Sequence, residues 1–350
     1  MALNRGSWLV CFSAVVLALS CVAECGANDE PATGELKPAW SLKGSWSGVV
    51  GDDKEDAVYA LDANGKCAEL DSAGKTRREF KLPQAGGSVL RLASWPGEEG
   101  KALLAFGVWA LELRVYDFKG TPLWNYASGI DDVWATSLDG KSGSVIVGYN
   151  GGVGVHVLDS RGQLRWKSQA IGNVWHVCAG DVWDEGTPQV VTTSAKGQVH
   201  IFAGDGSKRT DIDAGCYANM VRVGKLSKDD KAATIIVAGS AHVAPEPKTV
   251  MMIALTSDGT TKWKLTVPAG AQAHVDSAML APGKPWLAVG MRGGLVHVID
   301  AEKGVILASA KDQGMAPEVG WSVGASSGSP LVLVATRGKL NAFSVGEPKD

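Results

Sequence analysis

The chain has 350 residues, of which 45% are hydrophobic and 20% are charged, with 44 glycines, 14 prolines and a formal net charge of −3. Glycine is nearly twice as frequent as its usual ~7%, whereas proline is too scarce for a collagen-like or proline-rich disordered chain. The 34 basic residues are balanced by 37 acidic ones, which argues against nucleic acid or an anionic membrane surface as the partner. The composition therefore predicts a globular protein with one or two cores.

The first 27 residues have the features of a secretory signal peptide. Arg5 supplies the positive charge, and residues 8–19 form an apolar run that is too short to span a bilayer, which needs about twenty residues. Small residues permit cleavage after Ala23 or Ala27. The alternative is a bacterial lipoprotein signal, in which Cys21 carries the lipid. In both cases the mature chain is exported.

The rest of the chain is expected to form one domain between two short polar ends. Residues 28–36 are a polar leader, residues 37–346 hold the domain, and residues 347–350 are a tail. No other segment has the eighteen or so apolar residues that a transmembrane helix requires. We therefore expect a protein of the periplasm or cell envelope, without a transmembrane segment and with a possible lipid anchor.

A hairpin signal recurs along the domain. It consists of a β-branched run, an Asp or its equivalent, two residues and a glycine, and then a polar strand that often carries Trp. The turn-opening residues are Asp71, Asp117, Asp159, Ala203, Thr256 and Asp300, at separations of 46, 42, 44, 53 and 44 residues. Each unit holds four short alternating runs broken by Gly, Asn or Asp, which is typical of strands joined by hairpins. Four antiparallel strands repeated every ~40 to 45 residues predict the blades of an all-β propeller.

The last unit indicates how the ring closes. A seventh unit begins at Glu318 but contains only three strands, and residues 37–42 carry a Trp like the outer strands of other units. We expect this N-terminal strand to complete the seventh blade, because a ring closed in this way leaves no free strand edge at the seam. The sequence thus predicts a seven-bladed β-propeller of four-stranded antiparallel blades.

The Asp-x-x-Gly turn followed by Trp, as in residues 159–166, resembles the blade repeat of PQQ-like (quinoprotein-like) propellers over residues 37–346. For the dehydrogenases of that family, the resemblance implies a PQQ cofactor, eight blades, an adjacent Cys-Cys pair and a calcium site. This sequence has no Cys-Cys pair and seven predicted blades. The resemblance therefore implies the non-catalytic branch, with no cofactor predicted and PQQ or calcium as alternatives.

The first hairpin of each unit is also similar to the calcium-loop repeat of integrin-like (FG-GAP) propellers. In the best case, residues 180–189, Asp181 and Glu185 match acidic positions of the loop, whereas Trp183 and Gln189 replace two other oxygen ligands. Calcium takes six to eight oxygen ligands, so the loss of two weakens the match. No metal site is predicted, and this loop is the calcium alternative.

The histidines and cysteines of the strands favour structural roles. The histidines that recur at one slot of the third strands are His156, His200 and His297. Equivalent slots lie on different blades, too far apart to share one metal ion, so we expect each histidine to be bonded within its own blade. Cys178 and Cys216 are about six strand residues, or about 20 Å, out of register, which is too far for a disulfide. With Cys67 they are expected to remain free thiols.

Aromatic and polar residues collect where the innermost strands begin. The tryptophans aligned near this point are Trp46, Trp134, Trp175 and Trp321. The polar residues around them are Arg91, Asp131, Asp132, Asn173, His176, Asn219, His274, Asp276 and Glu318. The same face should carry the turns between second and third strands, and residues 239–249 insert into this turn of the fifth unit alone. The candidate ligand-binding residues at this channel mouth are Trp134, Trp175, His176, Asp131, Asp132, Asn219, His274, Asp276, Glu318 and Trp321.

Two interpretations of the mouth follow from the sequence. Its tryptophan rings stack on a sugar, a peptide or a partner's side chain, or they pack one blade against the next. We expect a monomeric, non-catalytic scaffold that binds an envelope protein or a small polar ligand. It would be similar in kind to the propeller lipoprotein of the bacterial outer-membrane assembly machinery. The alternative is a PQQ- or metal-dependent dehydrogenase, or a hydrolase or lyase, with its active site at the mouth; no G-x-S-x-G motif is present.

Overall fold

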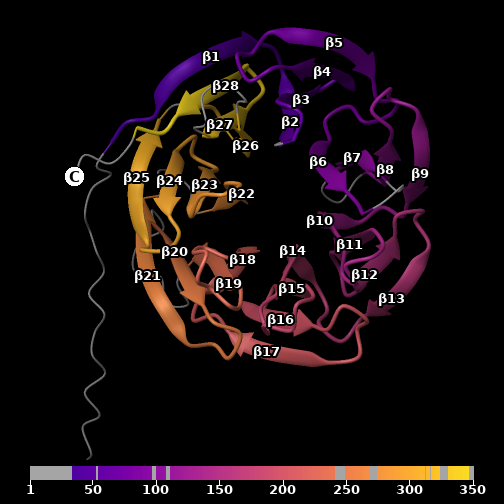
Figure 1. Ribbon diagram of the computed structural model, residues 1–350, viewed down its shortest axis with the longest axis vertical. Helices are drawn as coiled ribbons and strands as arrows, with labels where there is room; N and C mark the ends of the chain where they lie inside the picture. Colours follow the sequence, from indigo (N-terminus) through magenta and orange to yellow (C-terminus); the bar gives the residue numbers. More distant parts are fainter. Residues whose placement is uncertain are drawn as a thin grey trace, which may run out of the picture.

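The computed structural model describes residues 34–52, 54–96, 100–107, 111–240, 249–268, 274–311, 313–315, 317–323 and 330–346. Within these ranges the chain forms seven four-stranded antiparallel sheets arranged in a ring around a central channel (Figure 1). The expected signal peptide, the tail, most of the leader and residues 241–248 of the fifth-blade insertion lie outside the described residues. No helix of the described part is long and apolar enough to cross a membrane.

Four blades follow one another in the first part of the ring, each listed from its innermost to its outermost strand. Blade 1 comprises β2 (Trp46–Asp52), β3 (Ala57–Asp62), β4 (Lys66–Leu70) and β5 (Thr76–Lys81). Blade 2 comprises β6 (Val89–Ser94), β7 (Lys101–Phe106), β8 (Leu113–Tyr116) and β9 (Pro122–Tyr126). Blade 3 comprises β10 (Ile130–Thr136), β11 (Ser144–Tyr149), β12 (Gly154–Asp159) and β13 (Leu164–Ser168). Blade 4 comprises β14 (Val174–Gly180), β15 (Gln189–Ser194), β16 (Gln198–Phe202) and β17 (Arg209–Asp213).

Three further blades complete the ring. Blade 5 comprises β18 (Tyr217–Gly224), β19 (Thr234–Ser240), β20 (Thr249–Leu255) and β21 (Thr261–Pro268). Blade 6 comprises β22 (Val275–Leu280), β23 (Trp286–Met291), β24 (Val296–Asp300) and β25 (Val305–Ala310). Blade 7 comprises β26 (Glu318–Val323), β27 (Pro330–Ala335), β28 (Lys339–Ser344) and, outermost, β1 (Lys37–Lys43).

The N-terminal strand closes the ring, as the sequence predicts. Strand β1 pairs antiparallel with β28, with Trp40 opposite Ala342, so the first and last described strands share blade 7 (Figure 1). The prediction of a seven-bladed all-β propeller with four-stranded blades is confirmed. Each blade packs between two others, so every described sheet has a neighbouring blade on both of its faces.

The hydrophobic core lies between the blades rather than within one of them. The second strands are almost entirely buried, and two of them, β11 and β15, are buried along their whole length. Between blades 3 and 4, for example, Ile146 and Val157 pack in one cluster with Val177 and Val190. This packing explains why second strands such as β11 are mostly apolar runs, since both of their faces are covered. The same packing holds the innermost strands in contact around the channel.

The Asp-x-x-Gly turn and the outer-strand Trp of the repeat form a joint between neighbouring blades. The indole N–H of each outer-strand Trp donates to a turn carbonyl of the next blade at 2.8 Å, in the pairs Trp40–Ser72, Trp124–Ser160, Trp166–Gly204 and Trp263–Ala301. The ring also lies against the glycine of that turn: a Cβ on Gly162 would come within 2.8 Å of Trp124. Asp159 stabilises the turn, because its Oδ1 accepts the N–H groups of Arg161 and Gln163.

Candidate functional site

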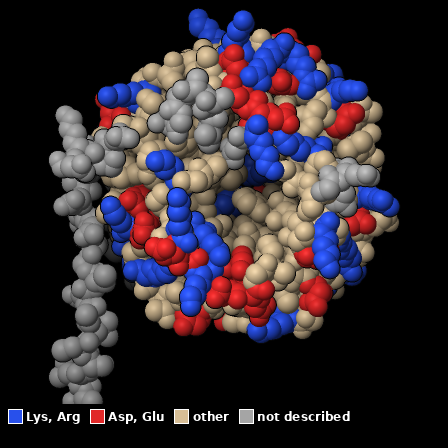
Figure 2. Space-filling view, in the orientation of Figure 1, with Lys and Arg blue, Asp and Glu red and all other residues tan. Residues whose placement is uncertain are grey.

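A cavity of about 600 Å³ opens at the end of the channel where the innermost strands begin. Of the predicted ligand-binding residues, those that line it are Asp131, Asp132, Trp175, His176, Asn219, His274, Asp276 and Glu318. The further lining residues are Val89, Arg91, Phe106, Tyr217, Ser240, Val275 and Arg292. We call the cavity lined by these fifteen residues the mouth cavity. Figure 2 shows the ring from one of its two faces, where the central channel opens as a hollow with basic and acidic side chains interspersed around it.

Backbone bulges place many of these side chains in the mouth cavity. In five of the seven described inner strands, the pairing with the second strand skips one residue near the strand start. The skipped residues are Ser47, Asp131, Trp175, Asn219 and Asp276. A bulge puts two residues opposite one and redirects a side chain. This is why neighbours such as Asp131 and Asp132, or Trp175 and His176, both line the cavity instead of alternating between two faces.

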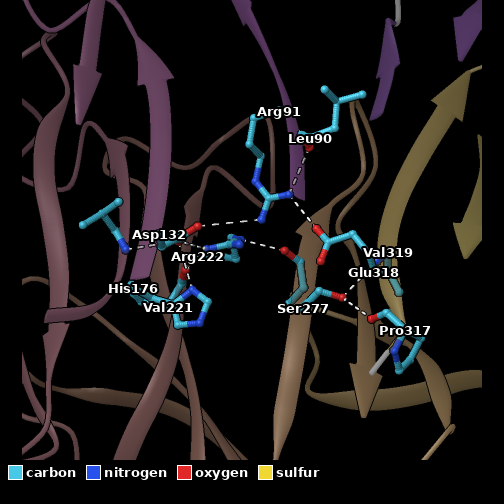
Figure 3. A network of polar contacts seen from close by, with 12 residues as sticks. Leu90, Arg91, Asp132, His176, Val221, Arg222, Ser277, Pro317, Glu318 and Val319 are labelled. Carbon is cyan, nitrogen blue, oxygen red and sulfur yellow. Dashed lines mark hydrogen bonds and ion pairs between the residues drawn. The ribbon is translucent and has the colours of Figure 1, made fainter. Parts of the chain in front are cut away.

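A network of charged side chains forms the floor of the mouth cavity (Figure 3). Arg91 on β6 lies between two carboxylates, 2.5 Å from Glu318 on β26 and 3.7 Å from Asp132 on β10. Asp132 also contacts His176 on β14 at 2.9 Å and Arg222 on β18 at 3.6 Å. These five side chains come from five different blades and meet across the channel axis. The network therefore separates the mouth cavity from the rest of the channel.

The two buried carboxylates of this network have opposite pKa shifts. Burial alone would raise the pKa of Asp132, but the charges of His176, Arg222 and Arg91 outweigh burial and hold it well below its usual value. Burial raises the pKa of Glu318, and Arg91 only partly opposes this effect. Asp132 is therefore a permanent carboxylate at neutral pH, whereas Glu318 is the group that takes up a proton more readily.

Asp132 orients the imidazole of His176 toward the cavity. An ionised carboxylate can only accept hydrogen bonds, so His176 Nδ1 carries the proton that it donates to Asp132 Oδ2 at 2.9 Å. The backbone N–H of Val177 donates to the same oxygen at 3.3 Å, which holds the carboxylate in place. The Nε2 atom of His176 is left to accept or, when protonated, to donate a hydrogen bond.

A second polar group lines the wall of the mouth cavity between blades 5 and 6. Arg292, in the turn between β23 and β24, donates to Asp276 Oδ1 through Nη2 at 2.6 Å and Nε at 2.9 Å. Asn219 donates through Nδ2 to His274 Nδ1 at 3.0 Å. Burial lowers the pKa of His274, and the nearby Arg292 lowers it further, so this imidazole is neutral at pH 7. The contact of Arg292 with Asp276 confirms that these turns share a face with the inner-strand starts.

The sequence aligns the four inner-strand tryptophans at one position near the start of their strands. The structure places them in different registers, so this expectation is wrong. Relative to the bulges, Trp46 precedes its bulge, Trp175 is the bulge itself, and Trp134 lies three residues beyond Asp131. Trp46 and Trp321 are buried in inter-blade clusters, where the indole of Trp321 donates to the carbonyl of Met279.

The tryptophans also line different cavities. Trp134 and Trp321 line a different cavity, at the other end of the channel. Trp175 lines the mouth cavity and belongs to none of the hydrophobic clusters of the described residues. Packing therefore accounts for Trp46 and Trp321, but it does not account for Trp175.

The third-strand histidines have the structural roles expected of them, with one correction. His200 contacts Asp211 at 2.8 Å and His297 contacts Ser309 at 2.7 Å, each within its own blade. The partner of His156 is instead Tyr126 on β9, so this contact at 3.1 Å joins blade 3 to blade 2. The expectation of a bond within the blade is wrong for His156, because its slot faces the outer strand of the preceding blade.

Two further expectations concern the cysteines and the calcium loop. The cysteines Cys67, Cys178 and Cys216 are buried free thiols, as expected. In the loop of residues 180–189, Asp181 accepts the backbone N–H groups of Glu185 and Gly186 at 2.9 and 3.0 Å. The Gln189 amide donates to the Thr187 carbonyl at 2.7 Å, and its oxygen accepts the N–H of Val182 at 2.8 Å. The side-chain amide of Gln189 thus occupies the interior of the loop, and hydrogen bonds within the loop hold its shape.

The described residues include no cluster of three or more His, Cys, Asp or Glu arranged to hold a metal ion. Asn173 and Trp46, which the sequence places near the mouth, do not line the mouth cavity. The most important residue missed from the sequence is Arg222, which is 1% exposed at its side chain. The sequence feature that could have drawn attention to it is a single arginine within the apolar run of β18.

Comparison with known proteins adds no family to this description. No protein-family model matches the chain, and no curated protein matches its sequence. The structure itself assigns the fold, a seven-bladed β-propeller whose last blade is closed by the N-terminal strand.

Proposed function

We propose that this chain is an exported, non-catalytic β-propeller that binds a small polar ligand in its mouth cavity and serves as a binding scaffold of the cell envelope. Export rests on the signal-like residues 1–27, with Cys21 as the alternative lipid anchor. Membership of the non-catalytic PQQ-like propellers is part of the proposal. It is supported by the repeated Asp-x-x-Gly…Trp motif and by the inter-blade joint that this motif forms.

One observation carries the proposal: a partly exposed indole and pre-oriented polar groups face the same cavity. Trp175 offers an aromatic face, His176 is fixed by Asp132, and Asp276 is fixed by Arg292. A rigid aromatic surface beside a few oriented hydrogen-bonding groups is typical of sites for sugars, amino acids and short peptides. The cavity of about 600 Å³ lies within the range of small-molecule sites.

The experiment is a thermal-shift screen of the mature chain against mono- and disaccharides, amino acids and dipeptides. We expect at least one class to raise the melting temperature through preferential binding to the folded state. In a Trp175→Ala variant that shift should be lost, while the ligand-free melting temperature falls by only a few degrees, because Trp175 is outside the core clusters.

The matched control is Leu123→Ala, which removes an exposed side chain on the outer strand β9. This variant should keep the ligand-induced shift. If Trp175→Ala unfolds the protein as a core tryptophan would, or keeps the full ligand shift, the proposed site is wrong.

A second candidate is an acid–base enzyme at the same mouth, a hydrolase or lyase. The observation in its favour is the contact between Asp132 and His176, which is the arrangement that orients a general base. The two candidates differ in the fate of the ligand. Recovery of the bound compound unchanged after long incubation supports the binding protein, and its recovery as a product supports the enzyme.

A further inference from the structure

A second cavity of about 260 Å³ lies at the opposite end of the channel, where the innermost strands end. Its walls include Val50, Trp134, Met279, Leu280 and Trp321. These side chains are apolar, and among the described residues of the lining only Arg222 is charged. Arg222 does not line the mouth cavity, whereas Asp132, Arg91 and Glu318 do. The buried charge network therefore presents its carboxylates to the mouth and one guanidinium to this second cavity.

Arg222 keeps unused donors within the described structure. Its Nε donates to the carbonyl of Ala278 and its Nη1 to the carbonyl of Val221, each at 2.7 Å. Its nearest carboxylate, Asp132, lies 3.6 Å from Nη1 and already accepts from His176 and the backbone N–H of Val177. The Nη2 atom is buried and has no hydrogen-bond partner among the described residues. A guanidinium has five N–H donors, so one edge of Arg222 lacks an acceptor.

The charge of Arg222 is also poorly compensated. Burial lowers its pKa, and the neighbouring Arg91 lowers it further, against the opposing effect of Asp132. The ring of Trp134, 5.3 Å from the guanidinium carbon, supplies only a cation–π contact. A buried cation with free N–H groups is costly unless an anion or acceptor meets it.

We infer that the second cavity is a binding site for a small carboxylate with an apolar body. The carboxylate accepts hydrogen bonds from Arg222 Nη2, and the carbon body packs against Val50, Met279 and Leu280. The volume of about 260 Å³ is below the usual range for drug-sized ligands, which limits the occupant to a molecule such as an aromatic monocarboxylate. This site does not depend on the function proposed for the mouth.

The test is calorimetric titration of the mature chain with benzoate and with its neutral isostere, benzamide. We expect benzoate to bind and benzamide to bind at least about tenfold more weakly, because the charge-assisted hydrogen bond is lost. Equal binding of the two compounds would overturn the assignment to Arg222. The absence of benzoate binding would overturn the site altogether.

Two variants, each of which fills one cavity with a larger side chain, show which cavity binds benzoate. Val50→Phe places a ring in the second cavity and leaves Arg222 unchanged, and it should abolish benzoate binding. Val89→Phe, the matched control, narrows the mouth cavity and should leave benzoate affinity within about twofold. The opposite pattern would place benzoate at Arg292 in the mouth and refute the inference.

A crystal soaked with 4-bromobenzoate provides an independent location. We expect the bromine signal beside Leu280, with the carboxylate next to Arg222 Nη2. A signal confined to the mouth cavity would contradict the inference even if the titrations had agreed with it.

Discussion

At the residue scale, the decisive feature is a set of charges that the fold buries together. Asp132 is the shared acceptor for His176, Arg222 and Arg91, and Glu318 shares Arg91 with it (Figure 3). The sequence indicates that Asp132, His176 and Glu318 lie near one another, because all three start inner strands. It does not indicate Arg222, because a lone arginine within an apolar strand carries no information about which blade supplies its partner.

The pKa shift of Glu318 predicts a pH dependence of stability. Its folded-state pKa is raised above the unfolded value of about 4.3, so the folded protein binds this proton more tightly. The stability that Glu318 contributes is fully present when the pH is below its pKa in the unfolded chain. This stability is lost as the pH rises through its pKa in the folded protein. Relative to Glu318→Gln, the native chain should therefore be more stable at about pH 4.5 than at about pH 7.5.

Urea unfolding of both proteins at the two pH values measures this difference. The comparison with Glu318→Gln cancels the titration of the other carboxylates. A difference between the two proteins that does not change with pH would show that the pKa of Glu318 is not shifted by folding. A difference that favours the native chain at the higher pH would show that folding lowers this pKa, and either result would contradict the prediction.

At the element scale, hairpin turns are predictable from sequence and bulges are not. The Asp-x-x-Gly turns are visible because each one needs an acceptor side chain and a glycine with positive φ, as at Asp159 and Gly162. A bulge adds one residue without changing the residue types around it. Alignment of the repeats therefore places Trp46, Trp134 and Trp175 together, although the bulges assign them to different positions.

The joint between blades predicts a specific cost at Gly162. Gly162→Ala adds a Cβ that meets Trp124 at 2.8 Å, whereas Gly140→Ala adds one in open space at a similar positive φ. Both variants place an alanine at a positive φ and share that backbone strain. The difference between their free energies of unfolding therefore measures the effect of the contact with Trp124. We expect Gly162→Ala to be less stable than Gly140→Ala by about 1–3 kcal/mol, which is the usual cost of overpacking.

Thermal or urea unfolding of the two glycine variants checks this prediction. Adding Trp124→Ala to each variant should remove most of the difference, because the atom that the new Cβ meets is gone. Equal stability of the two single variants would mean that the Trp124 contact does not join the blades.

At the scale of the whole molecule, the ring brings together inner-strand residues that are far apart in the sequence. The period of the repeat predicts the number of blades and the closing strand, because both depend on turn spacing and on the need to cover strand edges. The shape of the channel is less predictable. Its division into two cavities depends on side-chain contacts across the axis, between Arg91, Asp132, Arg222 and Glu318.

The most direct test of the account is a crystal structure of the mature chain with the compound that gives the largest thermal shift. We expect electron density for that compound in the mouth cavity, stacked on the Trp175 ring and hydrogen-bonded to His176 or to the group formed by Asp276 and Arg292. Density only on the outer surface of the ring, with the mouth cavity occupied by water alone, would contradict it.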